Sequence, residues 1–211
     1  MSLNGPSNSQ NEKNNNKSKK SNSIKFGLIS QDKSHINVYD LINSYFKNSK
    51  PIKYIIKDEF HYEFTPISFP QLTITINNLR KIENILGKYN LFHFFLIFID
   101  IQNSNCIDFL EKAIDVIIDA GENTYNKKCF IFGFYKDNEK PKVPEEKITI
   151  IIEAKGIDYY YCQLKNDEID NFSKTMERVI NNCNTIMIEK FLDQKHSELV
   201  LDNSNSKCYI F

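Results

Sequence analysis

The sequence has no tryptophan and few residues that break secondary structure, with 6 glycines and 6 prolines among 211 residues. It also has no apolar run of about eighteen residues, the length that a membrane-spanning helix needs. Any membrane attachment is therefore expected to be post-translational. An excess of basic charge is missing too, because lysine plus arginine and aspartate plus glutamate are equal at 27 each. Nucleic-acid binding requires a dense basic surface and is not expected.

The five cysteines show no C-x-x-C pair and no short spacing to histidine: Cys106, Cys129, Cys162, Cys183 and Cys208. A structural zinc site is therefore not expected. The odd number of cysteines, together with a polar start that lacks a secretory leader, favours reduced thiols in the cytosol.

The composition divides the chain into one globular domain with polar ends. Apolar residues make up 41% and aromatic residues 13%, enough for one well-buried core. Residues 1–23 are rich in Asn, Ser and Lys and are expected to form a disordered arm. Residues 24–183 are expected to be the domain and 184–207 a flexible tether, followed by the tetrapeptide 208–211.

Short apolar runs alternate with helical spacing from residue 24 onward, which is typical of α/β proteins. Strands are expected at 24–30, 53–65, 71–76, 92–101, 128–133 and 157–162, the second and third forming a half-buried hairpin. Helices are expected at 106–120, 145–154 and 167–183, and after the first strand, where Ile36, Leu41, Ile42 and Tyr45 share one face. Asp100 lies at the end of the central strand and is expected to cap the next loop.

A phosphate-binding motif is suggested directly after the first expected strand. Residues 27–34, GLISQDKS, have the spacing G-x-x-x-x-G-K-[ST], with Asp32 in place of the second glycine. In that motif backbone N–H groups surround the phosphates, and Lys33 and Ser34 would contact the outer phosphates and Mg²⁺. Taken alone, the segment is better explained as a polar turn between a strand and a helix.

The chain resembles a Ras/Rab-superfamily small GTPase from about residue 24 to residue 180. Residues 95–103 (FLIFIDIQN) are similar to the fourth strand of that family. Residues 130–137 (FIFGFYKD) occupy the place of the strand and N-K-x-D motif, and 155–165 (KGIDYYYCQLK) that of the last strand and S-A-K loop. The resemblance implies a three-layer α/β/α domain with a mostly parallel sheet of about six strands and one antiparallel hairpin.

The same resemblance implies which residues would bind GTP or GDP with Mg²⁺: Gly27, Asp32, Lys33, Ser34, Asp137 and Lys165, with Ser34 on the metal. The departures from the family pattern concern the parts that sense nucleotide. Asp32 brings a negative charge to the phosphates, and two like charges about 4 Å apart repel by about 1 to 4 kcal/mol. Pro51 is followed by Ile52 instead of the switch Thr, and residues 75–79 contain no D-x-x-G.

Hydrolysis is therefore expected to be lost, and the resemblance favours a pseudo-GTPase that binds effector or regulator proteins in signalling or membrane trafficking. Two alternatives stay open. One is a divergent but active GTP-binding switch with slow hydrolysis. The other is a prenylated trafficking protein of a different α/β family, such as a longin domain.

The last four residues, Cys208 to Phe211, match the C-a-a-X pattern of prenylation, and a terminal Phe favours geranylgeranyl. A prenyltransferase would then modify Cys208 and place the protein on the cytoplasmic face of the plasma membrane or endomembranes. Because one lipid chain anchors only weakly, a second signal is expected. The lysines of the amino-terminal arm and Cys183 are the candidates for it.

Overall fold

The computed structural model describes residues 22–31, 38–45, 52–56, 59–66, 68, 70–79, 81–121, 128–136, 139–165 and 169–205. Its elements follow in the order β1 (Asn22–Ser30), α1 (Val38–Tyr45), β2 (Ile52–Ile56), β3 (Glu59–Phe64), β4 (Leu72–Asn78), α2 (Asn84–Lys88), the 3-10 turn η1 (Tyr89–Leu91), β5 (Phe94–Asp100), α3 (Cys106–Ala120), β6 (Cys129–Tyr135), α4 (Glu145–Ala154), β7 (Tyr159–Lys165) and α5 (Ile169–Asn205).

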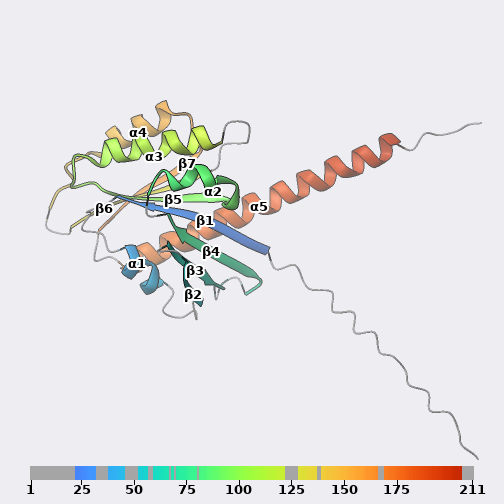
Figure 1. The fold of residues 1–211 in the computed structure, drawn as a ribbon, viewed down its shortest axis with the longest axis horizontal. Coiled ribbons are helices and arrows are strands. Elements are labelled where there is room, and N and C mark those ends of the chain that lie inside the picture. Colours follow the sequence, from blue (N-terminus) through green and yellow to red (C-terminus); the bar gives the residue numbers. More distant parts are fainter. Residues whose placement is uncertain are drawn as a thin grey trace, which may run out of the picture.

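The strands form one sheet in the order β2-β3-β4-β1-β5-β6-β7 (Figure 1). Neighbours from β4 to β7 run parallel, while β3 pairs antiparallel with both β2 and β4. The expected α/β class with a mostly parallel sheet is confirmed. The expected strand at 53–65 is divided into β2 and β3, so the sheet has seven strands instead of about six. In the sequence, Lys57-Asp58 interrupts the apolar pattern at this point.

Helices cover both faces of the sheet, as expected for three layers. α1 and α5 pack on one face, and α2, α3 and α4 on the other (Figure 1). Successive side chains of a strand point to opposite faces. In β5, Phe94, Leu96 and Phe98 therefore face α1 and α5, whereas Phe95 and Ile97 face α2 to α4.

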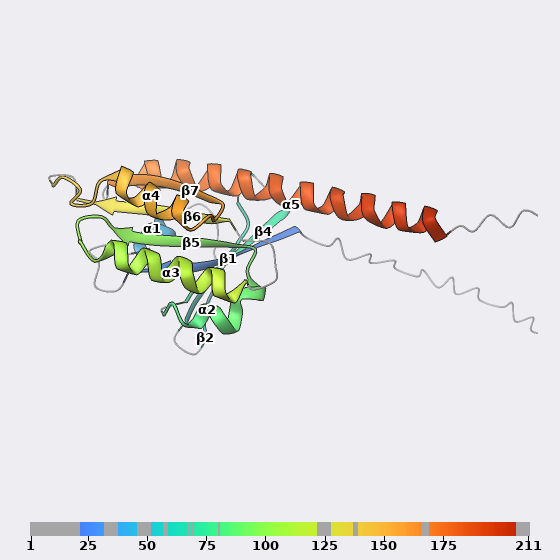
Figure 2. The ribbon, with the colours of Figure 1, turned by 90° about the horizontal axis from the view of Figure 1, so that it is seen from above.

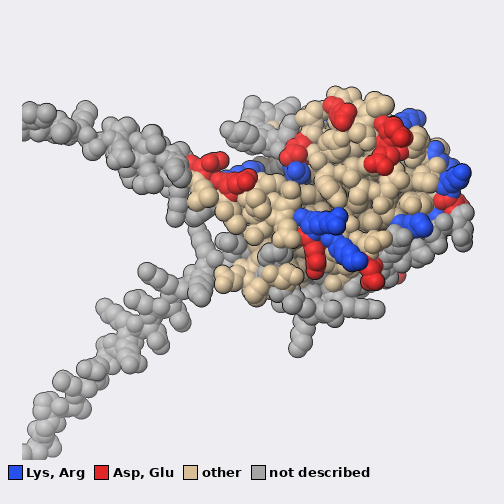
Figure 3. All heavy atoms as spheres, turned by 180° about the vertical axis from the view of Figure 1, so that it is seen from behind, with Lys and Arg blue, Asp and Glu red and all other residues tan. Residues whose placement is uncertain are grey.

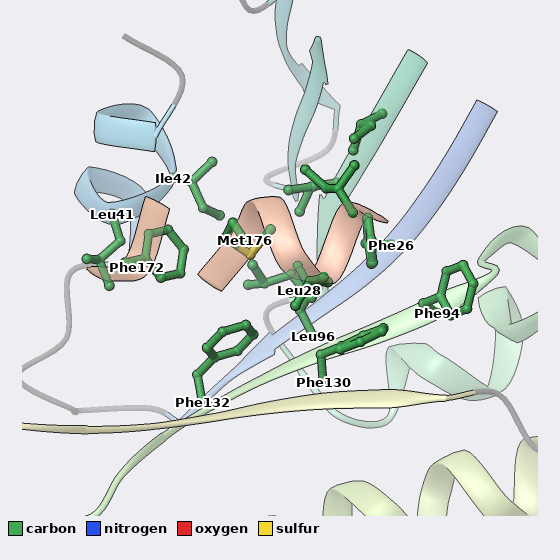
Figure 4. Close-up of a cluster of buried hydrophobic side chains, with 14 of the residues drawn as sticks. Phe26, Leu28, Leu41, Ile42, Phe94, Leu96, Phe130, Phe132, Phe172 and Met176 are labelled. Carbon is green, nitrogen blue, oxygen red and sulfur yellow. The ribbon is translucent and has the colours of Figure 1, made fainter. Parts of the chain in front are cut away.

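The two layers of side chains differ in chemistry. The layer under α1 and α5, here called the aromatic core, is rich in phenylalanine: Phe26, Phe64, Phe94, Phe98, Phe130, Phe132, Phe134 and Phe172 (Figure 4). The layer under α2 to α4, here called the aliphatic core, is rich in isoleucine: Ile29, Ile82, Ile85, Ile97, Ile99, Ile101, Ile107, Ile114, Ile117, Ile131, Ile148, Ile152 and Ile157.

The expected bounds of α3 and α4 are confirmed, and local signals account for them. The Asn103 side chain accepts from the backbone N–H of Asn105 just before α3, at 3.0 Å, and the N–H of Gly121 closes the helix on Ile118 O at 2.9 Å. Two glutamates in the first turn of α4 favour its N-terminus. The chain leaves α4 at Gly156, whose φ of +65° is the left-handed conformation that glycine adopts without strain.

The carboxyl-terminal helix is longer than the sequence predicts. A flexible tether was expected from residue 184, but α5 continues as one helix of 37 residues to Asn205. Cys183 belongs to the aromatic core, and Ile186 and Met187 still pack against it. No glycine or proline follows Gly156, so the sequence has no residue that would end the helix after the core contacts stop. Beyond these contacts α5 projects from the domain (Figures 1 and 2).

Candidate functional site

Two of the residues predicted to bind nucleotide lie in the described structure, and it does not bring them together. Gly27 lies inside β1, paired with Asn77 and Phe95, and Lys165 is the last residue of β7, opposite Tyr135. β5 and β6 separate the two strands. Asp32, Lys33, Ser34 and Asp137 lie outside the described residues, as do Cys208 and the amino-terminal arm up to residue 21.

The role of Gly27 is explained by packing within the sheet. A Cβ atom at this position would lie 2.8 Å from Cε1 of Phe95 and 3.0 Å from Cδ2 of Phe92. Non-bonded carbon atoms repel at such distances, because their optimal separation is about 3.5–4.0 Å. Glycine therefore lets the Phe95 ring lie against β1.

β1 continues through the segment in which the resemblance implied a phosphate loop. Leu28, Ile29 and Ser30 remain in register with β5, and the N–H of Gln31 donates to Phe98 O at 3.1 Å. A phosphate loop instead curls so that successive N–H groups converge on an anion. Residues 28–31 do not form that arrangement, because they extend the strand.

A chain of buried polar groups joins the carboxyl ends of the central strands. Gln31 Oε1 accepts from the backbone N–H of Asp100 at 3.0 Å, and Asp100 Oδ1 accepts from the N–H of Gln102 at 3.0 Å. Gln102 Nε2 donates to Glu139 Oε2 at 2.8 Å. Gln31, Asp100 and Gln102 are 6–7% exposed. The expectation that Asp100 caps its loop is confirmed, whereas the two glutamines and Glu139 were not predicted.

Backbone bonds attach the segment before α4 to the same place. The N–H groups of Lys142 and Val143 both donate to Ile101 O, at 3.0 and 3.1 Å, and the N–H of Ile101 donates to Phe134 O at 3.0 Å. Val143 is 5% exposed and belongs to the aliphatic core. The end of β5 and the turn after it are thus hydrogen-bonded to the carboxyl ends of both β1 and β6.

The exit of β4 is closed by apolar residues. Leu79 is fully buried, its N–H donates to Leu28 O at 2.8 Å, and its carbonyl accepts from Asn84 Nδ2 at 3.1 Å. Ile82, Ile85 and Tyr89, in and around α2, belong to the same aliphatic core. Leu79 and the apolar residues in and around α2, next to the place where the resemblance implies a second nucleotide sensor, are therefore part of the hydrophobic interior.

The position of the first residue of N-K-x-D is also part of the interior. Phe134 is fully buried and packs against Phe98, Phe132 and Phe172, with ring centroids 5.3 to 6.4 Å apart. The resemblance implies a polar side chain facing a base at this position, whereas Phe134 is a ring of the aromatic core.

The polar chain of Gln31, Asp100, Gln102 and Glu139 does not suit the phosphates of a nucleoside triphosphate. The two charged groups in the polar chain, Asp100 and Glu139, are carboxylates and would repel phosphate. Groups of three or more His, Cys, Asp or Glu arranged for a metal ion do not occur among the described residues. On the face shown in Figure 3, the described acidic and basic side chains are interspersed.

The described cysteines are thiols of low reactivity, three of them buried and Cys162 half-buried. Burial raises the pKa of Cys106 to about 11 and those of Cys129 and Cys162 to about 12, and it also raises the pKa of Cys183. Because the thiolate is the reactive form, these groups stay protonated at neutral pH. Cys183 is fully buried in the aromatic core, so it cannot carry a second lipid in the folded domain.

None of the described helices is both long enough and apolar enough to cross a bilayer. No protein-family model matches the chain, and no curated protein matches its sequence.

Proposed function

We propose that the chain is a lipid-anchored relative of the Ras/Rab small GTPases that acts as a pseudo-GTPase, a binding module whose conformation does not depend on nucleotide. Its support begins with the architecture: a parallel sheet with an antiparallel edge, α1 and α5 on one face and three helices on the other. The sequence resemblance implies this arrangement of layers. The module binds effector or regulator proteins in signalling or membrane trafficking.

One observation carries the pseudo-GTPase proposal. β1 runs past Gly27 to Gln31, and the Gln31 side chain bonds to the exit of β5. In open α/β sheets, ligands bind at the carboxyl ends of the strands where the chain order reverses. Here that point lies between β1 and β5, because the chain goes from β1 to β4 on one side and then crosses to β5 on the other. The protein's own side chains occupy it.

The burial of the β4 exit supports the same proposal. A nucleotide switch needs segments that are ordered in one state and released in the other. Leu79, Ile85 and Tyr89 are each at most 2% exposed, so releasing this segment would expose a large apolar area. The energetic cost favours one conformation over two.

The direct test is the nucleotide content of the purified protein. We expect little GTP or GDP by chromatography of the denatured protein, and GTP hydrolysis no faster than in buffer. Stoichiometric nucleotide with measurable turnover would instead establish the alternative, a divergent but active GTPase. Asp32→Gly is expected to raise affinity for GDP·Mg²⁺ while hydrolysis stays absent, since residues 75–79 supply no switch Gln. Titration with a fluorescent GDP analogue measures the affinity.

The anchor is a separate part of the proposal. Geranylgeranylation of Cys208 by a prenyltransferase would hold the protein on the cytoplasmic face of the plasma membrane or endomembranes, with the amino-terminal lysines as the second signal. An apolar chain contributes about 0.8 kcal/mol per buried CH₂. Cys208→Ser should move the protein to the cytosol in cell fractionation and remove a geranylgeranyl mass increment. A Cys208→Ser protein that stays on membranes would contradict the anchor and leave the rest of the proposal intact.

A further inference from the structure

The bonds at the carboxyl edge form one uninterrupted path across three elements. It runs from Phe98 O to the Gln31 N–H, from Gln31 Oε1 to the Asp100 N–H, and from Asp100 Oδ1 to the Gln102 N–H. Gln102 Nε2 then reaches Glu139 Oε2 in the segment between β6 and α4. Each bond has a length between 2.8 and 3.1 Å, within the range of good hydrogen bonds.

We propose that Gln31, Asp100, Gln102 and Glu139 form a permanent internal latch, which takes the place of a nucleotide in holding together the exit of β1, the turn after β5 and the segment before α4. This inference deepens the proposed function, because it names what keeps the pseudo-GTPase in one conformation. A partner would then find the same surface whether or not nucleotide is present.

Burial explains why the latch persists. Breaking a bond to a buried polar group costs the full desolvation penalty of that group, so each link of a satisfied buried chain is strongly maintained. The last hydrogen bond of the path joins the buried Gln102 to the exposed Glu139, and these two residues lie 37 positions apart in the sequence. The bond to Glu139 involves a carboxylate and is therefore among the stronger ones.

Glu139 is the residue at which to test the latch, because its exposed side chain can be changed without opening a core cavity. Glu139→Ala removes the acceptor, and Glu139→Gln retains an acceptor oxygen. Lys140→Ala is the matched control, an exposed residue at the next position. Hydrogen exchange of the amides of Lys142 and Val143 reports on the attachment of this segment to Ile101.

We expect Glu139→Ala to speed exchange of the Lys142 and Val143 amides roughly tenfold, as the loss of one charge-assisted hydrogen bond allows. Amides in the middle of β5 should not change, Lys140→Ala should match the wild type, and Glu139→Gln, which keeps only a neutral acceptor, should lie between the wild type and Glu139→Ala. Unchanged exchange at Lys142 and Val143 in Glu139→Ala would overturn the latch, as would an equal effect of Lys140→Ala.

A second measurement distinguishes a failure of the latch from a failure of the proposed function. Wild-type protein is measured with and without millimolar GDP·Mg²⁺, and we expect the same exchange at Asp100 and Gln102 in both. Protection of these amides by GDP would overturn both the latch as a substitute for nucleotide and the pseudo-GTPase proposal. A failure of Glu139→Ala with no response to GDP would overturn the latch alone.

Discussion

The two faces of the sheet are filled by different chemistry although they come from the same strands. In β6, Phe130, Phe132 and Phe134 point into the aromatic core, while Cys129 and Ile131 point into the aliphatic core. The aromatic core lies under α5 and the short α1, and the aliphatic core under α2, α3 and α4. Large rings thus fill the face that carries fewer helices.

Within the described strands, glycine occurs only on the face that carries the aliphatic core. The neighbours of Gly27 and Gly133 in their strands point into the aromatic core, so the two glycines face the aliphatic side. A Cβ at Gly27 would lie 2.8 Å from the Phe95 ring, and a Cβ at Gly133 would lie 2.7 Å from the Tyr161 hydroxyl. The aliphatic core therefore admits an aromatic ring where a strand glycine makes room for it. The difference between the faces indicates that Gly27 serves the packing of the aliphatic face.

The largest effect is expected from Phe98→Ala, at the centre of the aromatic core. Phe98 is fully buried, and its ring centroid lies 5.1 to 6.0 Å from those of Phe132, Phe134 and Phe172. The free energy of unfolding should fall by about 3–5 kcal/mol, measured by urea denaturation. Ile97→Ala, the neighbour that faces the aliphatic core, is the matched variant and should cost about 2–5 kcal/mol. A loss of less than about 2 kcal/mol for Phe98→Ala would contradict the central place of the ring cluster.

Much of the fold could be predicted from periodicity, and the failures have local causes. The expected helices at 106–120 and 145–154 have the observed bounds, because apolar spacing and flanking glycines both mark them. α2 was missed because five residues are too few to show a helical period. The length of α5 was missed because a polar helix without a breaker resembles a tether in composition.

The candidate site was harder to predict because its contacts are distant in sequence. The apolar pattern predicts a strand to Ser30 and the motif spacing predicts a loop from Gly27, and only the register with Phe98 decides between the two. Gln31 bonds to a residue 69 positions away, a partner that a single sequence does not reveal. The available signal was position: Gln31 follows β1 directly and Gln102 follows β5 by two residues, at the edge where polar side chains converge.

An intermediate effect is expected from Gly27→Ala, which tests the packing role of this glycine. The added methyl would lie 2.8 and 2.9 Å from two carbons of the Phe95 ring, so overpacking should cost about 1–3 kcal/mol. Gly87→Ala in α2 is the control: it has nothing within 4 Å and should stabilise the protein by up to about 1 kcal/mol through helix propensity. Combining Gly27→Ala with Phe95→Leu should recover part of the loss. An additive double variant would mean that the ring is not what excludes a side chain.

The smallest effect is expected from Ile131→Val, which removes one methylene from the aliphatic core. Ile131 is fully buried, and valine keeps the branched Cβ that suits a strand, so the cost is confined to the lost contacts and a small cavity. We expect about 0.5–1.5 kcal/mol by urea denaturation. Ile150→Val in α4 is the matched control, because Ile150 is 65% exposed and its methylene is already in water. Equal effects of the two variants would mean that Ile131 is less tightly packed than its burial indicates, and the contrast between a ring-filled and a closely packed aliphatic face would then need another basis.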